Sequence, residues 1–331
     1  MYNITQVVES FKQNAKIGLF FDESLASRSS FKIGGKASLL AEPLDSEALA
    51  FALTAIKEQN VPYFILGGGS NVLFSDSGFD GIIVSTKKLC GIEIVESHSG
   101  NERIAQDQDC AAADQAAPQT IIRAGAGANL AALVSFAQER GLSGLEEFAG
   151  LPGTVGGAAY MNARCFEKEI SQVAGKIQWL EWDQKDRAFV QKEAAFAPSD
   201  WQYKKSPFTG TGRIVTAVQF VLSKGNAEES AKKAAAFVQA RKDRGHYKAP
   251  CAGSVFKNNH AFGRPTGKII DELGLKGKSS GGAQIAPFHG NIIINKGGAK
   301  ASDVLFLIDL CKKEAKEKFG FDLEEEIVVA G

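Results

Sequence analysis

The feature that most constrains this chain is a run of three glycines placed directly after a predicted strand. The run opens the stretch GGGSNVLFSDSGFDGIIV, residues 67–84, and follows the apolar segment VPYFIL. Glycine reaches backbone conformations closed to other residues and lets the main chain approach a ligand closely. Similar glycine-rich turns occur at residues 125–127 and 150–157. The fold must therefore hold several tight turns at strand ends.

Two familiar nucleotide motifs are excluded. A Walker A loop needs Lys-Ser/Thr after its last glycine, whereas Ser70 and Asn71 follow Gly69. The dinucleotide fingerprint GxGxxG must open a helix, and the residues after Gly69 are too rich in turn formers. The turn at Gly125 does precede a predicted helix, but Leu130 stands at its third glycine position.

Glycine turns can still bind anions without a lysine, because their exposed N–H groups form concave sites. Several such turns in one chain favour a phosphate-bearing ligand. The alternative interpretation is that they are only tight turns. Pattern and spacing do not identify the ligand.

Composition narrows the function classes. The 331 residues have 38 basic and 38 acidic side chains, which gives no support for nonspecific nucleic-acid binding. No signal peptide and no bilayer-spanning apolar run are expected. The 5 cysteines are widely spaced without a CxxC pair, so neither a zinc site nor a disulfide framework is predicted. We expect a cytoplasmic protein with no metal site and no membrane or nucleic-acid partner.

Periodicity and caps predict mixed helices and strands without the strict alternation of a doubly wound sheet. Residues 97–118 are polar and are expected to form an exposed loop. Helices are predicted over residues 4–11, 46–58, 130–139, 227–244 and 302–319, and strands over 61–66, 81–85, 120–123, 176–182, 188–192, 213–222 and 291–295, followed by a terminal strand that includes the run of three glutamates at 324–326.

Four segments in order carry a resemblance: GGGSNVLFSDSGFDGIIV, GLEEFAGLPGTVGGAAYMNA, AGSVFKN and GGAQIAPFHGNIIIN. Together they resemble the UDP-N-acetylenolpyruvoylglucosamine reductase family, FAD- and NADPH-dependent enzymes that complete UDP-N-acetylmuramate synthesis for peptidoglycan. The resemblance implies an α+β chain. An FAD-binding domain of the vanillyl-alcohol-oxidase/p-cresol-methylhydroxylase type would span 1–222, in lobes of about 1–89 and 90–222, before a substrate-binding domain at 223–331.

The resemblance also implies noncovalent FAD, with NADPH as co-substrate. Asn162, in the YMNA segment, is expected beside the isoalloxazine ring. The residues expected to bind the cofactor are Gly67, Gly68, Gly69, Ser70, Asn71, Gly125, Pro152, Gly153, Thr154, Gly156, Gly157 and Asn162.

The implied reaction is ping-pong: NADPH reduces FAD, then hydride passes from flavin N5 to the methylene carbon of the enolpyruvyl group. Negative charge develops on the neighbouring carbon and its carboxylate, so a cation or donors must stabilise it and an acid must quench it. Ser254 matches the family's proton donor, although a turn serine bonding its own backbone is the alternative. Glu326 matches the catalytic glutamate. Alternation along a strand puts Glu324 on the same face, so it does not choose between the two.

One departure affects the catalytic set. The family's Tyr-Arg-x-Ser reads Tyr203-Lys204-Lys205-Ser206 here. We expect Lys204 to stabilise the enolate with a weaker grip on the carboxylate, because lysine lacks the bidentate fork of arginine.

The substrate-binding candidates are Tyr203, Asn258 and His289, and His289 is equally interpretable as a capping residue. Arg241 or Lys242 is a candidate for the diphosphate, with exposed helix charge as the better interpretation of each. Arg164 and Cys165 stand where the family usually has glycines around an aromatic residue.

Two other functions stay open at this point. One is a sugar or alcohol oxidase of the same flavin fold, and the other is a noncatalytic binder of flavin or nucleotide sugar. The expected partner is a small nucleotide-sugar substrate, and the expected oligomeric state is a monomer.

Overall fold

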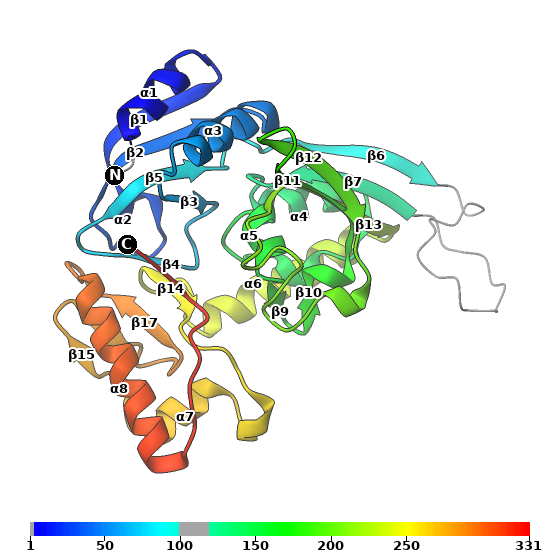
Figure 1. Cartoon of the computed structure of the whole chain (residues 1–331). Coiled ribbons are helices and arrows are strands. Elements are labelled where there is room, and N and C mark those ends of the chain that lie inside the picture. The colour runs from blue at the N-terminus through cyan, green and yellow to red at the C-terminus, as the bar shows by residue number, and fades with distance from the viewer. Residues whose placement is uncertain (1–2, 99–118) are drawn as a thin grey trace. The chain divides into compact units, whose positions relative to one another are not determined.

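The computed structural model describes residues 3–98 and 119–331 (Figure 1). The chain divides into two units, one comprising Met1–Thr86 with Gln239–Gly331 and the other Lys87–Val238. Most of the loop predicted at 97–118 lies outside the described residues. The sequence predicted a boundary between two FAD-binding lobes near residue 89 and the start of a substrate-binding domain near residue 222. Both boundaries are defined by the ligand that each part binds, and they stay predictions.

The N-terminal part of the first unit is a four-stranded sheet with helices. The strand order is β1-β2-β5-β3, antiparallel between β1 and β2 and parallel at the other two pairings. The Asp45 carboxylate caps the predicted helix 46–58 by accepting from the Ala48 N–H at 2.8 Å. The elements are α1 (Ile4–Lys12), β1 (Ile17–Ser24), α2 (Leu25–Arg28), β2 (Lys36–Pro43), α3 (Ser46–Glu58), β3 (Tyr63–Leu66), β4 (Val72–Phe74) and β5 (Phe79–Ser85).

The C-terminal part of the first unit is an antiparallel sheet of order β14-β17-β16-β15. Helix α8 lies along this sheet (Figure 1) and buries Val304, Leu307 and Ile308 in a core shared with Ile285 and Ile293. The predicted helix 302–319 is therefore present, one residue longer. The elements are α6 (Ala227–Asp243), which begins in the second unit, β14 (Cys251–Ser254), η4 (His260–Phe262), α7 (Thr266–Glu272), β15 (Ser279–Ser280), β16 (Ala283–Ile285), β17 (Ile292–Asn295), α8 (Ala301–Phe319) and β18 (Val328–Ala330).

The terminal strand is shorter than predicted. Strand β18 covers only three residues and pairs in parallel with β4, with Val328 opposite Val72. The prediction that the glutamate run belongs to a regular terminal strand is wrong. The segment before β18 forms backbone hydrogen bonds with Val255 and Lys257 and accepts one from the Asn71 side chain, instead of forming a continuous ladder.

The second unit is built on a six-stranded antiparallel sheet, in which β12-β11-β13-β7-β6 are successive neighbours and β8 pairs with β13. Its core includes the fully buried rings of Phe148, Phe208 and Phe220. The elements are β6 (Ile92–His98), β7 (Gln119–Gly125), α4 (Leu130–Gln138), β8 (Leu142–Ser143), η1 (Glu146–Phe148), α5 (Val155–Tyr160), β9 (Arg164–Cys165), β10 (Lys168–Glu169), η2 (Ile170–Gln172), β11 (Ala174–Asp183), β12 (Ala188–Ala195), η3 (Pro198–Asp200) and β13 (Ile214–Lys224).

The described helices include none that is both long and apolar enough to cross a membrane. In the same residues no cluster of three or more His, Cys, Asp or Glu side chains could hold a metal ion.

Gly69 is a glycine of the first unit whose replacement should destabilise the fold. Its φ is +67°, and an added Cβ would lie 2.1 Å from the Arg28 carbonyl oxygen. We expect Gly69→Ala to lower the free energy of unfolding by about 3 kcal/mol, since backbone strain and a backbone clash add together. Urea unfolding of the purified proteins measures the loss.

Gly274→Ala is the matched control. Gly274 has a φ of +71° but no heavy atom within 4 Å of an added Cβ, so its variant carries the strain without the clash. We expect it to lose about 1 kcal/mol. Equal losses in the two variants would contradict a clash at Gly69.

Candidate active site

The first predicted phosphate loop packs against the turn that precedes β2. The Gly69 carbonyl accepts a hydrogen bond from the Ser30 N–H at 2.9 Å, and the Ser30 hydroxyl donates to the Cys251 carbonyl at 2.7 Å. Gly67, Gly68 and Ser70 are partly exposed where the chain leaves β3. The loop is thus rigid at Gly69 and accessible on either side of it.

The second and third glycine turns pack backbone to backbone within the second unit. The Gly156 N–H donates to the Ala126 carbonyl at 2.8 Å, and the Gly125 N–H donates to the Gly91 carbonyl at 2.8 Å. An added Cβ at Gly156 would lie 2.7 Å from the Ala126 Cβ. Both N–H groups are therefore bonded within the protein. Gly125 and Gly156 can contribute to a cofactor site through the shape of these two packed turns, which we call the cradle, without donating to a phosphate.

Neighbouring residues complete this cradle. The Gly153 carbonyl accepts from the Leu130 N–H at 3.2 Å, and Gly153 has a φ of +120°. Pro152 and Gly157 are exposed beside it, and Thr154 is buried between them. The accessible backbone of this loop therefore lies at Pro152, Gly153 and Gly157.

Two buried hydroxyls fit a phosphate-bearing cofactor. The Oγ1 of Thr154 and the Oγ of Ser29 have no hydrogen-bond partner among residues 3–98 and 119–331. Such orphaned groups are rare and need an explanation. Each lies beside one predicted phosphate loop, since the Ser29 Cα would be 3.0 Å from a Cβ at Gly69. Sequence reasoning missed Ser29, because its contact with Gly69 bridges distant parts of the chain.

Asn162 is a fully buried residue with a φ of +44°. Its Nδ2 donates to Glu169 Oε2 at 2.9 Å and to the Gln202 carbonyl at 3.1 Å, and its Oδ1 accepts from the Ser171 N–H at 3.1 Å. The amide therefore holds the segment that leads to the predicted catalytic lysine. Its expected place beside the flavin ring stays a prediction.

Tyr203 and Lys204 occupy the tip of a tight turn. Gln202 and Lys205 exchange backbone hydrogen bonds at 3.0 and 3.1 Å, and Lys204 has a φ of +58°. A lysine in the left-handed region costs about 1 kcal/mol or more, and such strain is found preferentially at functional sites. The buried Ser206 hydroxyl, which donates to the Tyr160 carbonyl at 2.6 Å, anchors the turn on its far side.

Arg164 has a local partner that the sequence did not indicate. Its Nη1 lies 3.7 Å from Glu169 Oε1, on the carboxylate that also accepts from Asn162. Cys165 next to it is buried.

Ser254 and Glu326 come together in the first unit through main-chain bonds. Ser254 ends β14 after an irregularity at Gly253, whose φ is +76°. The Glu326 N–H donates to the Val255 carbonyl at 2.7 Å, and the Asn71 Nδ2 donates to the Glu326 carbonyl at 3.0 Å. No described residue, in 3–98 or 119–331, pairs with the Ser254 hydroxyl. The predicted proton donor, the glutamate and one residue of the phosphate loop are therefore neighbours along one hydrogen-bonded path.

The three glutamates at 324–326 make different contacts. Glu324 pairs with Lys257, and Glu325 pairs with Lys312 at 2.5 Å. Glu326 is bonded through its backbone on both sides. Glu326 differs from Glu324 in its direct backbone bond to the residue that follows Ser254, a contact that the periodic pattern did not reveal.

Asn258 and His289 have protein contacts of their own. The Asn258 Oδ1 accepts from the Thr266 N–H at 2.9 Å, at the start of α7. The His289 Nδ1 accepts from the Asn291 N–H at 3.2 Å, and its ring lies 5.8 Å from that of His246. Burial lowers the pKa of His289, which agrees with a neutral ring that accepts at Nδ1.

The interpretation of Arg241 as exposed helix charge is wrong. Its exposed fraction is 8%, and its Nε donates to the Tyr247 hydroxyl at 3.2 Å. Lys242 is exposed as expected. The helix turns one of these two cations inward and the other into solvent.

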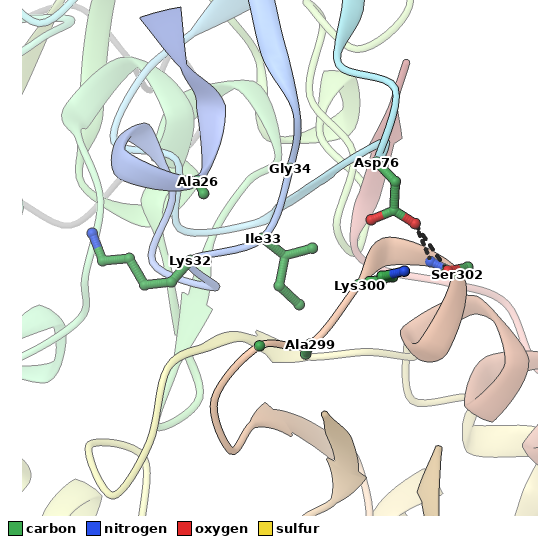
Figure 2. A pocket seen from close by; sticks show the side chains of 9 residues that line it. Ala26, Lys32, Ile33, Gly34, Asp76, Ala299, Lys300 and Ser302 are labelled. Atoms are coloured by element: carbon green, nitrogen blue, oxygen red, sulfur yellow. Dashed lines mark hydrogen bonds between the residues drawn. The ribbon is translucent and has the colours of Figure 1, made fainter. Parts of the chain in front are cut away.

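A cavity of about 590 Å³ lies at the start of α8 (Figure 2). Asp76 caps that helix there, accepting from the Ala301 N–H at 2.6 Å and the Ser302 N–H at 3.0 Å. Lys32 and Lys300 are among the residues that line it, and none of the predicted site residues takes part. The cavity is therefore separate from the candidate site.

The His246–His289 pair predicts a pH dependence of stability. Burial, followed by the charge of Arg241, lowers the pKa of His246 from 6.5 to about 4. The unfolded chain therefore binds protons more readily between these pH values, and stability is complete above pH 6.5 and lost as the pH falls toward 4. As the pH falls over this range, the free energy of unfolding of His246→Gln should decrease by about 1 kcal/mol less than that of the parent protein. This figure is reduced for solvent screening, because His246 is partly exposed.

Thermal unfolding at several pH values measures this difference. The groups that face His246 are Arg241, Arg244 and His289. His260→Gln serves as the control, because His260 is exposed. An unchanged pH slope in His246→Gln would refute the assignment.

Comparison with known proteins finds matches in both the N-terminal and the C-terminal part of the chain, and they point to the same family. A family model described as an FAD binding domain matches residues 37–181, and one described as the C-terminal domain of UDP-N-acetylenolpyruvoylglucosamine reductase matches residues 245–330. A UDP-N-acetylenolpyruvoylglucosamine reductase from Treponema denticola is 43% identical over 94% of this chain and 93% of its own length. One from Borreliella burgdorferi is 37% identical over 93% of each chain.

A solved structure shows the same fold. The crystal structure of UDP-N-acetylenolpyruvylglucosamine reductase from Thermus caldophilus has a TM-score of 0.70 and 30% identity, with 96% of this chain and 99% of that chain covered. The predicted fold class, α+β with an FAD-binding domain, is confirmed.

Proposed function

Since the chain belongs to the UDP-N-acetylenolpyruvoylglucosamine reductase family, we propose that it reduces the enolpyruvyl group of UDP-N-acetyl-3-O-(1-carboxyvinyl)glucosamine to UDP-N-acetylmuramate. It is an FAD-containing oxidoreductase. NADPH is the proposed reductant, and peptidoglycan precursor synthesis is the proposed pathway. We expect a monomer in the cytoplasm.

The observation that carries this proposal is the main-chain path joining Ser254 to Glu326. The Val255 carbonyl, one residue after Ser254, accepts from the Glu326 N–H at 2.7 Å. An acid–base pair must be held by rigid elements, and here the two residues lie on segments joined directly by backbone. Glu326 is the member of the run assigned to catalysis because its N–H bonds to the residue that follows Ser254, whereas Glu324 pairs with Lys257.

FAD, when bound, supplies the hydride that adds to the substrate's double bond. Ser254 donates the proton to the carbon next to the carboxylate, and Glu326 helps to stabilise the enolate-like state. Lys204 contributes the positive charge for the substrate carboxylate from its constrained turn. Tyr203, Asn258 and His289 are proposed to bind substrate. Asn258 and His289 already hold backbone groups, so they would use the remaining ring or amide atoms.

The cofactor residues are proposed in two groups. Gly67 to Asn71 form one phosphate loop, with Ser29 as an additional donor. Gly125 and residues 152–157 form the other, with Thr154 supplying its unpaired hydroxyl.

An anaerobic experiment tests the function. The yellow protein is mixed first with NADPH and then with the enolpyruvyl nucleotide sugar, while flavin absorbance is followed. We expect bleaching in the first step and recovery in the second. A flavin that NADPH does not bleach would favour an oxidase, and a bleached protein that the substrate does not reoxidise would favour a noncatalytic binder.

Lys204→Ala should slow reoxidation by substrate about 100-fold, because a charge aimed at the developing enolate is lost. Reduction by NADPH should change little. Lys205→Ala, the exposed neighbour, is the control and should behave like the parent protein. Lys204→Arg should retain activity. An unchanged reoxidation rate in Lys204→Ala would refute the role of Lys204.

Glu326→Gln and Glu324→Gln distinguish the two glutamates of the run. We expect Glu326→Gln to slow reoxidation by about 10²-fold or more, whereas Glu324→Gln should stay within about twofold of the parent protein. Stopped-flow absorbance measures both rates. Reversed effects would move the catalytic role to Glu324.

A further inference from the structure

Two buried asparagines bound strand β17. Asn291 directly precedes it and Asn295 ends it, with exposed fractions of 3% and 7%. The Asn295 Nδ2 donates to the Phe31 and Lys32 carbonyls at 3.1 and 3.2 Å. The Asn291 Oδ1 accepts from the Phe256 N–H at 2.9 Å, and its Nδ2 donates to the Phe256 carbonyl at 2.8 Å. The two residues are chemically equivalent but hold different segments.

Asn291 bonds to the peptide groups that directly follow Ser254. Its backbone carbonyl accepts from the Val255 N–H at 2.9 Å, which belongs to the Ser254–Val255 peptide. The next peptide, Val255–Phe256, is bonded on both edges: its N–H donates to the Asn291 side chain, and its carbonyl accepts from the Glu326 N–H. Asn291 and Glu326 therefore flank one peptide group.

Asn291 is itself held from the other side. Its N–H donates to the His289 Nδ1 at 3.2 Å, and the His289 ring packs against His246. The path from the histidine pair to the peptides beside Ser254 is thus continuous.

We infer that Asn291 is a positioning residue that fixes the backbone of Ser254 relative to that of Glu326. The inference rests on the proposed function, because it needs Ser254 and Glu326 to act together on substrate. Removing the amide leaves two buried backbone groups of Phe256 unpaired, so this segment must shift to find partners. A displacement of about 1 Å at reacting groups can cost about 100-fold in rate.

The test compares Asn291→Leu with Asn295→Leu, two changes of the same size and burial at opposite ends of one strand. Asn291→Leu should slow reoxidation of the reduced enzyme by substrate between about 10- and 100-fold, and leave flavin reduction by NADPH within about twofold. Asn295→Leu should leave both half-reactions within about twofold at a comparable loss of melting temperature. Equal effects of the two variants on reoxidation, or equal slowing of both half-reactions in Asn291→Leu, would overturn the inference.

Asn291→Asp gives a second readout that does not depend on the leucine variants folding. An ionised aspartate accepts from the Phe256 N–H but has no proton for the Phe256 carbonyl, whereas a protonated aspartic acid restores both bonds. Burial raises the pKa of such a carboxyl. The reoxidation rate of Asn291→Asp, divided by that of the parent protein, should therefore rise at least about fivefold from about pH 8 to about pH 6.

A flat ratio over that range would overturn the positioning role. A parent protein that substrate does not reoxidise at any pH would instead overturn the proposed function, and the inference with it. The two failures are therefore distinguishable.

Discussion

The hydrogen bonds between the C-terminal segment and two much earlier parts of the chain hold the candidate site of the first unit together. Strand β18 pairs with β4, the Asn71 amide donates to the Glu326 carbonyl, and the Glu326 N–H donates to Val255. Each of these bonds occupies a main-chain N–H or C=O group of the C-terminal segment, and a broken bond would leave that group without its partner. The phosphate loop, the proposed acid and the proposed glutamate consequently belong to one hydrogen-bonded framework.

Local signals in the sequence predicted most of the regular structure. The start of the helix at 46–58, for example, was predicted from one residue, the capping Asp45. The strand after Asn291 was predicted from its three consecutive isoleucines. Such features depend on a few adjacent residues, so one sequence is enough to find them.

The arrangement of the candidate site could not be predicted from local sequence, because it depends on contacts between residues far apart in the chain. The choice between Glu324 and Glu326 depended on the backbone bond from Glu326 to Val255. Period-two alternation failed because the glutamates precede β18 instead of lying in it. Ser29 and Asn291 were missed for the same reason. A serine or an asparagine in a loop can form several kinds of local hydrogen bond, so its role becomes clear only when its long-range partners are known. The family resemblance proposed the reacting residues but not the residues that support them.

The parallel pairing of β18 with β4 also has a consequence for synthesis on the ribosome. The second unit is encoded between the two halves of the first, and the antiparallel neighbours of its sheet come from within residues 87–238. It can therefore become compact while the chain is still being made, since domains fold as units during translation. Strand β4 has to wait for residues 328–330 before its partner exists. Until residues 328–330 are made, the edge of β4 that they pair with stays open, and an open apolar strand edge is prone to wrong pairing.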